Sequence, residues 1–430
     1  MALPRGKMTD ILLKTQSAFG TPATGNYART FAYSFDLGEK FGLPDDPILG
    51  LSRSNDRDMT APAPDLRRHD GRLSVPLDLN HLAYWLIGLF GAPDSYPEPA
   101  IGRIVFSGQP AAGSTITING VVFTFTDAAP GANEIEIQGS LPATLSEIVS
   151  VLNAALDVDV AEASYDEADG TTLTIEHDTE GPIGNAFTLA ASAGSNGTVS
   201  SATLEGGCHA HLFTSGGETL PPYSIETRLR SAAGGGPRFL RHIGVMVNAM
   251  TVRMNFAQGY HRADLEVVGR HEEAHTAASQ GGAPAALDLL QVPAAKGVLR
   301  IAGVAQVPIL AVEAAYRNNL QALEYVADAP YVSGHEPGDS AFSGTVRTRF
   351  ADETYYDYGR SSEPLAVAME WALDPGHGLF LSAPRLRFEK ASLPFEGPGG
   401  IELTLPFRAE QDENAAMLTA TLRNEIESYA

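Results

Sequence analysis

Cysteine, lysine and long apolar runs are all scarce in this chain of 430 residues. A single cysteine, Cys208, excludes an intrachain disulfide and a zinc site built from four cysteines. No run of eighteen apolar residues occurs and the first twenty residues lack a signal-peptide stretch, so we expect no membrane segment and synthesis in the cytoplasm. Acidic residues outnumber basic ones by 52 to 29. The net charge of −23 argues against binding nucleic acid or anionic lipid through a broad basic face.

Residues 101–207 differ in composition from the rest of the chain. They contain fourteen acidic residues and one basic residue, Arg103, and linker-like Pro-rich and Gly/Ser/Thr-rich stretches bound them. The pair Asn119-Gly120 between alternating residues predicts a β-hairpin over 115–126. Helical spacing predicts one apolar helix face from Ile148, Val149, Leu152 and Leu156. We therefore predict an inserted α+β domain over residues 100–207.

The two flanks of this segment look like two copies of one duplicated unit. Gly71-Arg-Leu-Ser-Val-Pro-Leu has a counterpart in Gly344-Thr-Val-Arg-Thr-Arg-Phe at an offset of 273, and 252–254 and 263–270 have counterparts at offsets of 134 and 138. The offset between matching residues is therefore smaller after residues 101–207 than before them, and an insertion of about 107 residues in the first copy accounts for most of this difference. The copies are the first repeat, over 1–99 and 208–276, and the second repeat, over 285–430.

Each repeat is expected to be mainly β. Alternating residues predict strands over 30–36, 72–79, 224–229, 245–256 and 264–268, with a similar set from Val298 onward, and strands over 171–176 and 185–190 in the insert. Residues 80–90 predict a compact apolar helix with Asn80 as its cap, and 352–358 lie at the matching place in the second copy. The predicted fold is thus a duplicated β-sandwich or barrel unit with one helix per repeat, plus an inserted small α+β domain.

Several stretches, in this order along the chain, resemble the major tail tube proteins of phages with long, non-contractile (siphovirus-type) tails. The similar parts are the opening Lys14-Thr-Gln-Ser-Ala-Phe-Gly-Thr-Pro-Ala, the Gly71 strand with the apolar helix after it, and the closing hairpin over 395–409. Residues 101–207 separately resemble decoration domains of phage tail proteins, through Ile118-Asn-Gly-Val-Val-Phe-Thr-Phe and Gly184-Asn-Ala-Phe-Thr-Leu-Ala.

The resemblance implies a structural subunit of the virion tail, with no catalytic centre, cofactor or metal. Such subunits form stacked rings around a lumen through which the genome DNA passes without specific binding. Two repeats per chain imply three chains per ring that imitate sixfold symmetry. The implied partners are further copies of the chain and the tape measure, tail terminator and tail tip or baseplate proteins.

One motif favours a different function. His271-Glu-Glu-Ala-His275 matches H-E-x-x-H, in which two histidines one helical turn apart bind zinc and the glutamate acts as general base. The alternative is therefore a zinc-dependent hydrolase that uses His271, Glu272 and His275. Because the motif follows a strand, precedes linker-like residues and lacks a nearby third ligand, we interpret 272–284 as a polar linker between repeats. A second alternative, a β-rich carbohydrate-binding adhesin module, follows from the β-rich pattern and the insert.

Two further clusters are interpreted structurally. Cys208-His-Ala-His211 offers metal-binding residue types, but alternation on a strand explains it equally well. Asp166-Glu-Ala-Asp-Gly170 resembles half a calcium loop without the distal glutamate, so we expect a turn there.

The long stretch 38–70 is the other functional candidate. Loops of this length inside a compact domain are uncommon and usually functional, so we predict an arm that reaches the next ring. Its charged side chains would supply specific ion pairs across that contact. The candidate inter-ring contact residues are Asp45, Asp46, Arg53, Asp56, Arg57, Asp58, Arg67 and Arg68.

Overall fold

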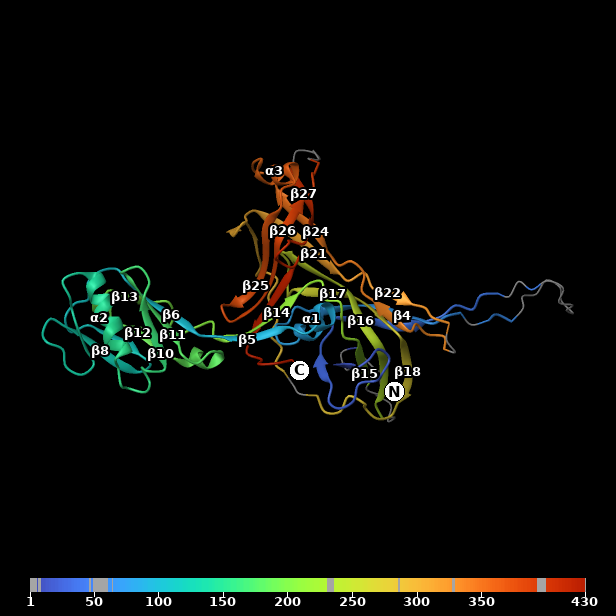
Figure 1. The fold of residues 1–430 in the computed structure, drawn as a ribbon, viewed down its shortest axis with the longest axis horizontal. Coiled ribbons are helices and arrows are strands. Elements are labelled where there is room, and N and C mark those ends of the chain that lie inside the picture. Colours follow the sequence, from blue (N-terminus) through green and yellow to red (C-terminus); the bar gives the residue numbers. More distant parts are fainter. Residues whose placement is uncertain are drawn as a thin grey trace. The chain divides into compact units, whose positions relative to one another are not determined.

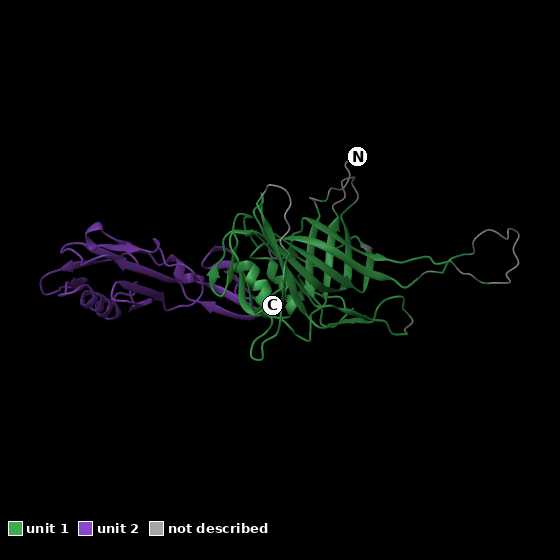
Figure 2. Cartoon of the chain, turned by 90° about the horizontal axis from the view of Figure 1, so that it is seen from above, with its two compact units in different colours: residues 1–93, 213–371, 380–420 green, residues 94–212, 372–379, 421–430 purple. Residues whose placement is uncertain are grey.

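The computed structural model describes residues 6, 9–45, 48, 61–63, 65–229, 236–284, 287–326, 329–392 and 400–429. Within these residues the protein is mainly β, with three α-helices and several sheets (Figure 1). The chain divides into two compact units (Figure 2). Unit 1 holds residues 1–93, 213–371 and 380–420, and unit 2 holds 94–212, 372–379 and 421–430. None of the helices in the described part of the chain is long and apolar enough to cross a membrane.

The first half of unit 1 is built from strands around one buried helix. Its elements are β1 (Asp10–Thr15), β2 (Ala28–Thr30), β3 (Ser34–Lys40), β4 (Arg68–Pro76), α1 (Leu82–Phe90), β15 (Tyr223–Leu229), β16 (Arg238–Asn255), β17 (Arg262–Gly269) and β18 (His271–Thr276).

The second half of the chain adds strands in a similar order and a shorter helix. These elements are β19 (Val298–Ile301), β20 (Val304–Ala305), β21 (Ile309–Arg317), β22 (Gln321–Leu323), β23 (Gly334–Glu336), β24 (Ala341–Arg349), α3 (Thr354–Ser361), β25 (Leu365–Asp374), β26 (His377–Phe388), β27 (Glu402–Ala409) and β28 (Thr419–Asn424).

One antiparallel sheet of unit 1 runs in the order β3-β4-β17-β16-β21-β24-β27-β26. The long strand β16 also belongs to a second sheet, because its first residues pair with β15 and β18 while β15 pairs with β1. In β17 every second residue is buried, so one face of this strand packs on the core.

Helix α1 is the apolar centre of the first half. All its residues except Tyr84 are buried, and the Trp85 indole N–H donates to the Thr30 hydroxyl at 3.2 Å. The predicted helix is confirmed, but its predicted cap is wrong. His81 is the N-cap residue, and the Asp78 carboxylate accepts the backbone N–H groups of Asn80 and His81 at 3.1 and 2.9 Å. The stabilising acceptor thus comes from before the helix.

Unit 2 contains two four-stranded sheets and one helix with their own apolar core. The sheets are formed from β6 (Ile101–Phe106), β10 (Ala163–Glu167), β11 (Thr172–His177) and β13 (Gly197–Val199), and from β7 (Thr115–Ile118), β8 (Val121–Thr126), β9 (Glu134–Glu136) and β12 (Leu189–Ala191). A further strand pair is β5 (Asp94–Glu98) with β14 (Cys208–Thr214). The core cluster is made of buried residues between Ala100 and Leu204.

The hairpin predicted at Asn119-Gly120 is confirmed: both residues have positive φ, and β7 pairs with β8 around them. Helix α2 (Leu141–Asn153) begins and ends earlier than its apolar pattern predicts. Ile148 and Leu152 are buried on it, but Leu156 lies beyond the helix and is 97% exposed, so its place in the helix face is wrong. The end of the helix sets that limit, since a residue outside it no longer follows the helical period.

Two expected strands are divided or shortened. The strand predicted over 30–36 is two strands, β2 and β3, which pair with different neighbours, β1 and β4. The strand predicted over 185–190 begins as a 3₁₀-helix (Pro182–Ala186) and becomes β12 only at Leu189. Each difference reflects tertiary pairing that local alternation does not contain.

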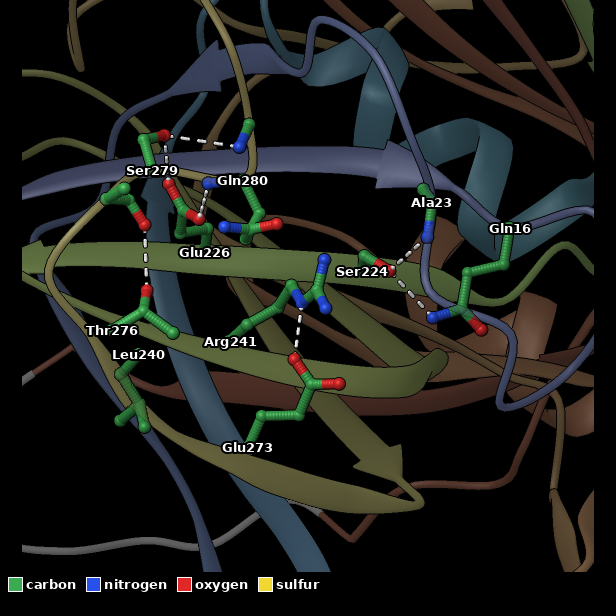
Figure 3. A network of polar contacts seen from close by, with 12 residues as sticks. Gln16, Ala23, Ser224, Glu226, Leu240, Arg241, Glu273, Thr276, Ser279 and Gln280 are labelled. Atoms are coloured by element: carbon green, nitrogen blue, oxygen red, sulfur yellow. Dashed lines mark hydrogen bonds and ion pairs between the residues drawn. The ribbon is translucent and has the colours of Figure 1, made fainter.

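The interpretation of 272–284 as a linker is wrong over 272–276, which lie in a strand, whereas the described residues 277–284 lie in no helix or strand. The first residues of this stretch belong to β18, which pairs with β16 and adds an Arg241–Glu273 ion pair at 2.6 Å. The chain beyond β18 is bonded to β15, because the buried Glu226 carboxylate accepts from the Ser279 hydroxyl at 2.5 Å and the Gln280 N–H at 2.7 Å (Figure 3). Together these contacts compensate the burial of Glu226.

Candidate assembly surfaces

The two halves of unit 1 are joined by a continuous sheet. Residues 249–255 of β16 pair with 317–311 of β21 in antiparallel register. Arg253 bridges the junction: its guanidinium bonds Glu313 of β21 at 2.7 Å and also Asp264 of β17. A strand ladder reinforced by a cross-strand ion pair therefore connects β16 to the second half of the chain.

Strand β3 lies at the edge of this sheet. Within the described chain its ladder partner is β4, on one side only, with Leu37 opposite Gly71. An edge strand presents unpaired N–H and C=O groups that can pair with another chain. The outer edge of β3 is therefore a candidate for contact between subunits.

The described residues 41–45, 61–63 and 65–67 extend the β3–β4 hairpin. Beyond Lys40 and Arg68 the two branches stay bonded to each other, since Asp65 N–H donates to Gly42 O at 3.0 Å and Ala63 N–H to Pro44 O at 3.3 Å. In Figure 2 these branches run side by side away from the sheets of unit 1. The prediction of an arm is consistent with this geometry, while its role in contacting another ring is not tested by it.

Arg67 anchors the base of the arm within the chain. Its guanidinium bonds the Glu39 carboxylate at 2.7 Å and lies over the rings of Phe41 and Tyr331. The backbone N–H of Arg67 donates to Pro330 O at 2.8 Å. Arg67 is therefore engaged inside its own chain. Asp45 and Arg68 are exposed, and Asp46, Arg53, Asp56, Arg57 and Asp58 lie outside the described residues.

Apolar side chains gather beside Arg67. Phe41, Leu66, Tyr325 and Val326, which we name the arm-base patch, are each more than half exposed. Leu66, Tyr325 and Val326 line a groove of about 320 Å³ with Pro330 and Tyr331. Exposed apolar groups that are grouped in this way often mark interaction sites. The sequence interpretation missed the patch, because its two parts are more than 250 residues apart.

The H-E-x-x-H motif lies on strand β18, not on a helix. Four residues along a strand span about 13 Å, which is too far for His271 and His275 to share one metal ion. The side chain of His275 lies outside the described residues. The zinc-site interpretation therefore fails on backbone geometry.

Glu272 instead lies near two buried histidines from other strands, His69 and His242. Nε2 of His69 is 3.0 Å from Nδ1 of His242, the ring centroids are 5.1 Å apart and the planes differ by 14°. This is a nearly coplanar, in-line N–H···N hydrogen bond, in which the two nitrogens face each other and not a common third point. Burial lowers the pKa of His69 to about 4, so this ring is neutral at pH 7. The cluster joins β4, β16 and β18.

The clusters over 208–211 and 166–170 both lie in unit 2, where their side chains have structural partners. Cys208 and His211 lie on β14, and both ring nitrogens of His211 are bonded, to the Ser95 hydroxyl at 2.8 Å and to Ile426 O at 2.9 Å. Burial raises the pKa of Cys208 to about 12. The predicted turn is confirmed over 168–171, where Asp169 accepts the N–H and the hydroxyl of Thr171 at 3.0 and 2.8 Å, but Asp166 and Glu167 belong to β10.

Comparison with known proteins gives one match. A family model described as phage tail tube protein matches residues 6–409. A search of curated proteins finds no match.

Proposed function

Because this chain belongs to the phage tail tube protein family, we propose that it assembles into stacked rings of three chains in a siphovirus-type tail. The protein is a structural component of the virion tail and not an enzyme. Its number of chains per ring, the passage of DNA and the role of residues 100–207 are the parts that we propose here.

The strand pairings support two repeats per chain. In the first half β1 pairs with β2 and β15, and β4 lies between β3 and β17. In the second half β19 pairs with β20 and β25, and β24 lies between β21 and β27. The same ladder order in both halves, each with one helix after its β4 or β24 strand, is the pattern that duplication and later divergence would leave.

Two glycines support the same equivalence. Gly71 and Gly344 are each the fourth residue of a nine-residue strand, β4 and β24. A Cβ on Gly71 would lie 2.0 Å from Asp36 O, and a Cβ on Gly344 would lie 1.9 Å from Glu313 O. Both positions need glycine because the neighbouring backbone approaches so closely.

The observation that carries the ring proposal is the β16–β21 junction. It already joins one repeat to the next within a single chain. If the second repeat meets the first repeat of another chain in the same way, the contact is head-to-tail and closes into a ring when the rotation fits. Six repeats at one sixth of a turn correspond to three chains.

The charge of the protein supports passage of DNA. A net charge of −23 disfavours the retention of phosphates through counterion release, which supports the proposal that DNA slides through the lumen without specific binding. The implied partners are the tape measure, tail terminator and tail tip or baseplate proteins.

Residues 100–207 fit a decoration domain. Their buried core is made of residues between Ala100 and Leu204 and needs no residue from elsewhere in the chain. Ile101 and Glu205 exchange two backbone hydrogen bonds at 2.9 and 3.1 Å, so the segment leaves and re-enters at one place. This is the arrangement expected of an inserted domain.

The arm would contact the adjacent ring through its exposed charges and through the arm-base patch. Arg67 is removed from the predicted contact pairs because it bonds Glu39 in its own chain. Arg68 and Asp45 stay as proposed contacts. Apolar burial on the patch would supply more of the stacking energy than the charges, since exposed ion pairs contribute little each.

Negative-stain microscopy of the purified protein tests the proposal. We expect rings and hollow tubes at high protein concentration. A compact monomer at all concentrations would contradict it.

A further inference from the structure

We propose that the β22–β23 hairpin, described over residues 321–326 and 329–336, is docked on unit 1 by uncharged histidines and is released when these are protonated. The device is a pH-sensitive contact between a short hairpin and the strands beneath it. It acts within a single chain, so it is independent of the proposed ring.

Few backbone hydrogen bonds tie this hairpin to the rest of unit 1. Strands β22 and β23 pair with each other, from Gln321 opposite Glu336 to Leu323 opposite Gly334, and form a sheet of their own. The loop between them accepts the Arg67 N–H described above. A two-stranded hairpin is at best marginally stable by itself. The side chains beneath it therefore decide whether it stays docked.

Three histidines at this contact each have a buried ring nitrogen that makes no hydrogen bond. His69 lies on β4, His271 begins β18, and His335 lies on β23 of the hairpin. In the part of the chain that the structure describes, Nδ1 of each ring is shielded from solvent and has no partner. His69 and His335 line one groove of about 250 Å³ together with Ala322 and Val332 of the hairpin.

Aromatic rings, which cannot accept a strong hydrogen bond, cover two of these histidines. The ring of His335 meets the ring of Phe19 edge-on, with centroids 5.6 Å apart. The ring of His271 lies 5.0 Å from the ring of Tyr331, which belongs to the hairpin loop. Such surroundings favour neutral imidazoles, because a buried charge without a hydrogen-bond partner is costly.

The third histidine, His69, is enclosed by backbone. Its Nε2 already lies 3.0 Å from Nδ1 of His242. A Cβ on Gly269 would lie 2.2 Å from Nδ1 of His69, so this nitrogen faces the backbone of β17. A proton added to Nδ1 would form an N–H without an acceptor, which disfavours the charged ring.

Charged groups face the histidines from each element packed against them. Besides His242, they are Glu39, Arg68, Asp70, Arg241, Arg270, Glu272, Glu273, Glu324 and Glu336. Carboxylates would stabilise a protonated histidine, but two of them already have a cation. Glu39 bonds Arg67 at 2.7 Å. Glu273 bonds Arg241 at 2.6 Å. Burial of the rings therefore outweighs the acids.

The direction of the pH response follows from this burial. It lowers the pKa of His69 and of His335 from 6.5 to about 4, and it lowers the pKa of His271 as well. A released hairpin thus binds protons more readily than a docked one, so docking is favoured above pH 6.5 and weakens as the pH falls towards 4. His335 alone raises the opening equilibrium about twentyfold between pH 7 and pH 5.

Release of the hairpin would also dismantle the base of the arm. The hairpin carries Tyr325 and Val326 of the arm-base patch, and its Tyr331 lies under the guanidinium of Arg67. Acid would therefore separate these side chains from Leu66 and Arg67, while the paired strands β4, β17 and β16 stay together.

Hydrogen exchange of the full-length free subunit at pH 7 and pH 5, corrected for intrinsic exchange rates, tests the proposal. We expect amides of 321–336 to lose protection by at least about twentyfold at pH 5, because local opening sets their exchange. Amides of β24 should keep their protection. Unchanged protection of the hairpin, or an equal loss in β24, would overturn the local release.

Glutamine variants identify the groups responsible. His335→Gln stays polar but cannot take up a proton, so it should reduce the loss at pH 5 by at least about tenfold. His271→Gln leaves the hairpin sequence unaltered and should also weaken the response; it decides the matter if His335→Gln does not fold. The matched control is His377→Gln in unit 2, whose ring bonds Asp374, and it should behave like the unaltered protein. A full acid response in the folded His335→Gln and His271→Gln proteins would overturn the proposal.

Discussion

Replacing Gly71 or Gly344 by alanine tests the equivalence of the two repeats through stability. The added Cβ would lie 2.0 Å or 1.9 Å from a carbonyl oxygen of the neighbouring strand, and real Cβ atoms essentially never come closer than 3.0 Å. The strands must therefore separate by about 1 Å. Overpacking of this kind costs about 1–3 kcal/mol, and a weakened ladder hydrogen bond costs about 1 kcal/mol more. We expect each substitution to lower the free energy of unfolding of unit 1 by about 2–4 kcal/mol.

Urea denaturation followed by near-UV circular dichroism measures this loss. In thermal unfolding it corresponds to a fall in Tm of roughly 3–7 °C, given the size of unit 1. The matched control is Gly38→Ala in β3, where the added Cβ meets no atom within 4 Å, and we expect a change within about 0.5 kcal/mol. If Gly71→Ala and Gly344→Ala were as stable as the control, the close approach of the two strands would be wrong. A large loss at one position only would contradict their equivalence.

Three other perturbations give clear expectations. Deleting 102–205 and closing the gap with a short Gly/Ser linker should leave rings and tubes intact, because Ile101 and Glu205 are already hydrogen-bonded neighbours. Failure of this variant to assemble, seen by negative-stain microscopy, would count against a separate inserted domain. Replacing 41–66 by a tight turn removes the arm together with Phe41 and Leu66 of the arm-base patch, and should leave rings that no longer stack, as judged by microscopy. Full-length tubes from this variant would refute the role of the arm. Burial lowers the pKa of His69 from 6.5 to about 4, so between these pH values the unfolded chain binds the proton more readily than the folded protein does. The free energy of unfolding should therefore fall as the pH drops from 6.5 towards 4, by up to about 1.4 kcal/mol per pH unit. His69→Gln should flatten that part of the pH profile, and an unchanged profile would show that His69 is not its source.

Local patterns in the sequence predicted the elements that local interactions determine. The hairpin at Asn119-Gly120 needs positive φ at two residues, and the sequence provides asparagine and glycine there. The apolar run of α1 predicted a compact helix, and its burial follows from its composition.

Contacts between distant segments decided what the sequence could not predict. Residues 271–276 are polar and resemble a linker, but they form β18 because an edge of β16 is available to pair with them. Arg67 looks like a free charge for another subunit until the fold brings Glu39 and Tyr331 beside it. The open edge of β3 has no local signature, because an unpaired edge is a property of the whole sheet.

The number of chains in one ring is the most direct test of the account. Cryo-electron microscopy of assembled tubes, at a resolution that separates the two repeats, measures it. We predict three chains per ring, with six similar repeats around the lumen. Six chains per ring would contradict the central claim that the second repeat takes the place of a neighbouring subunit.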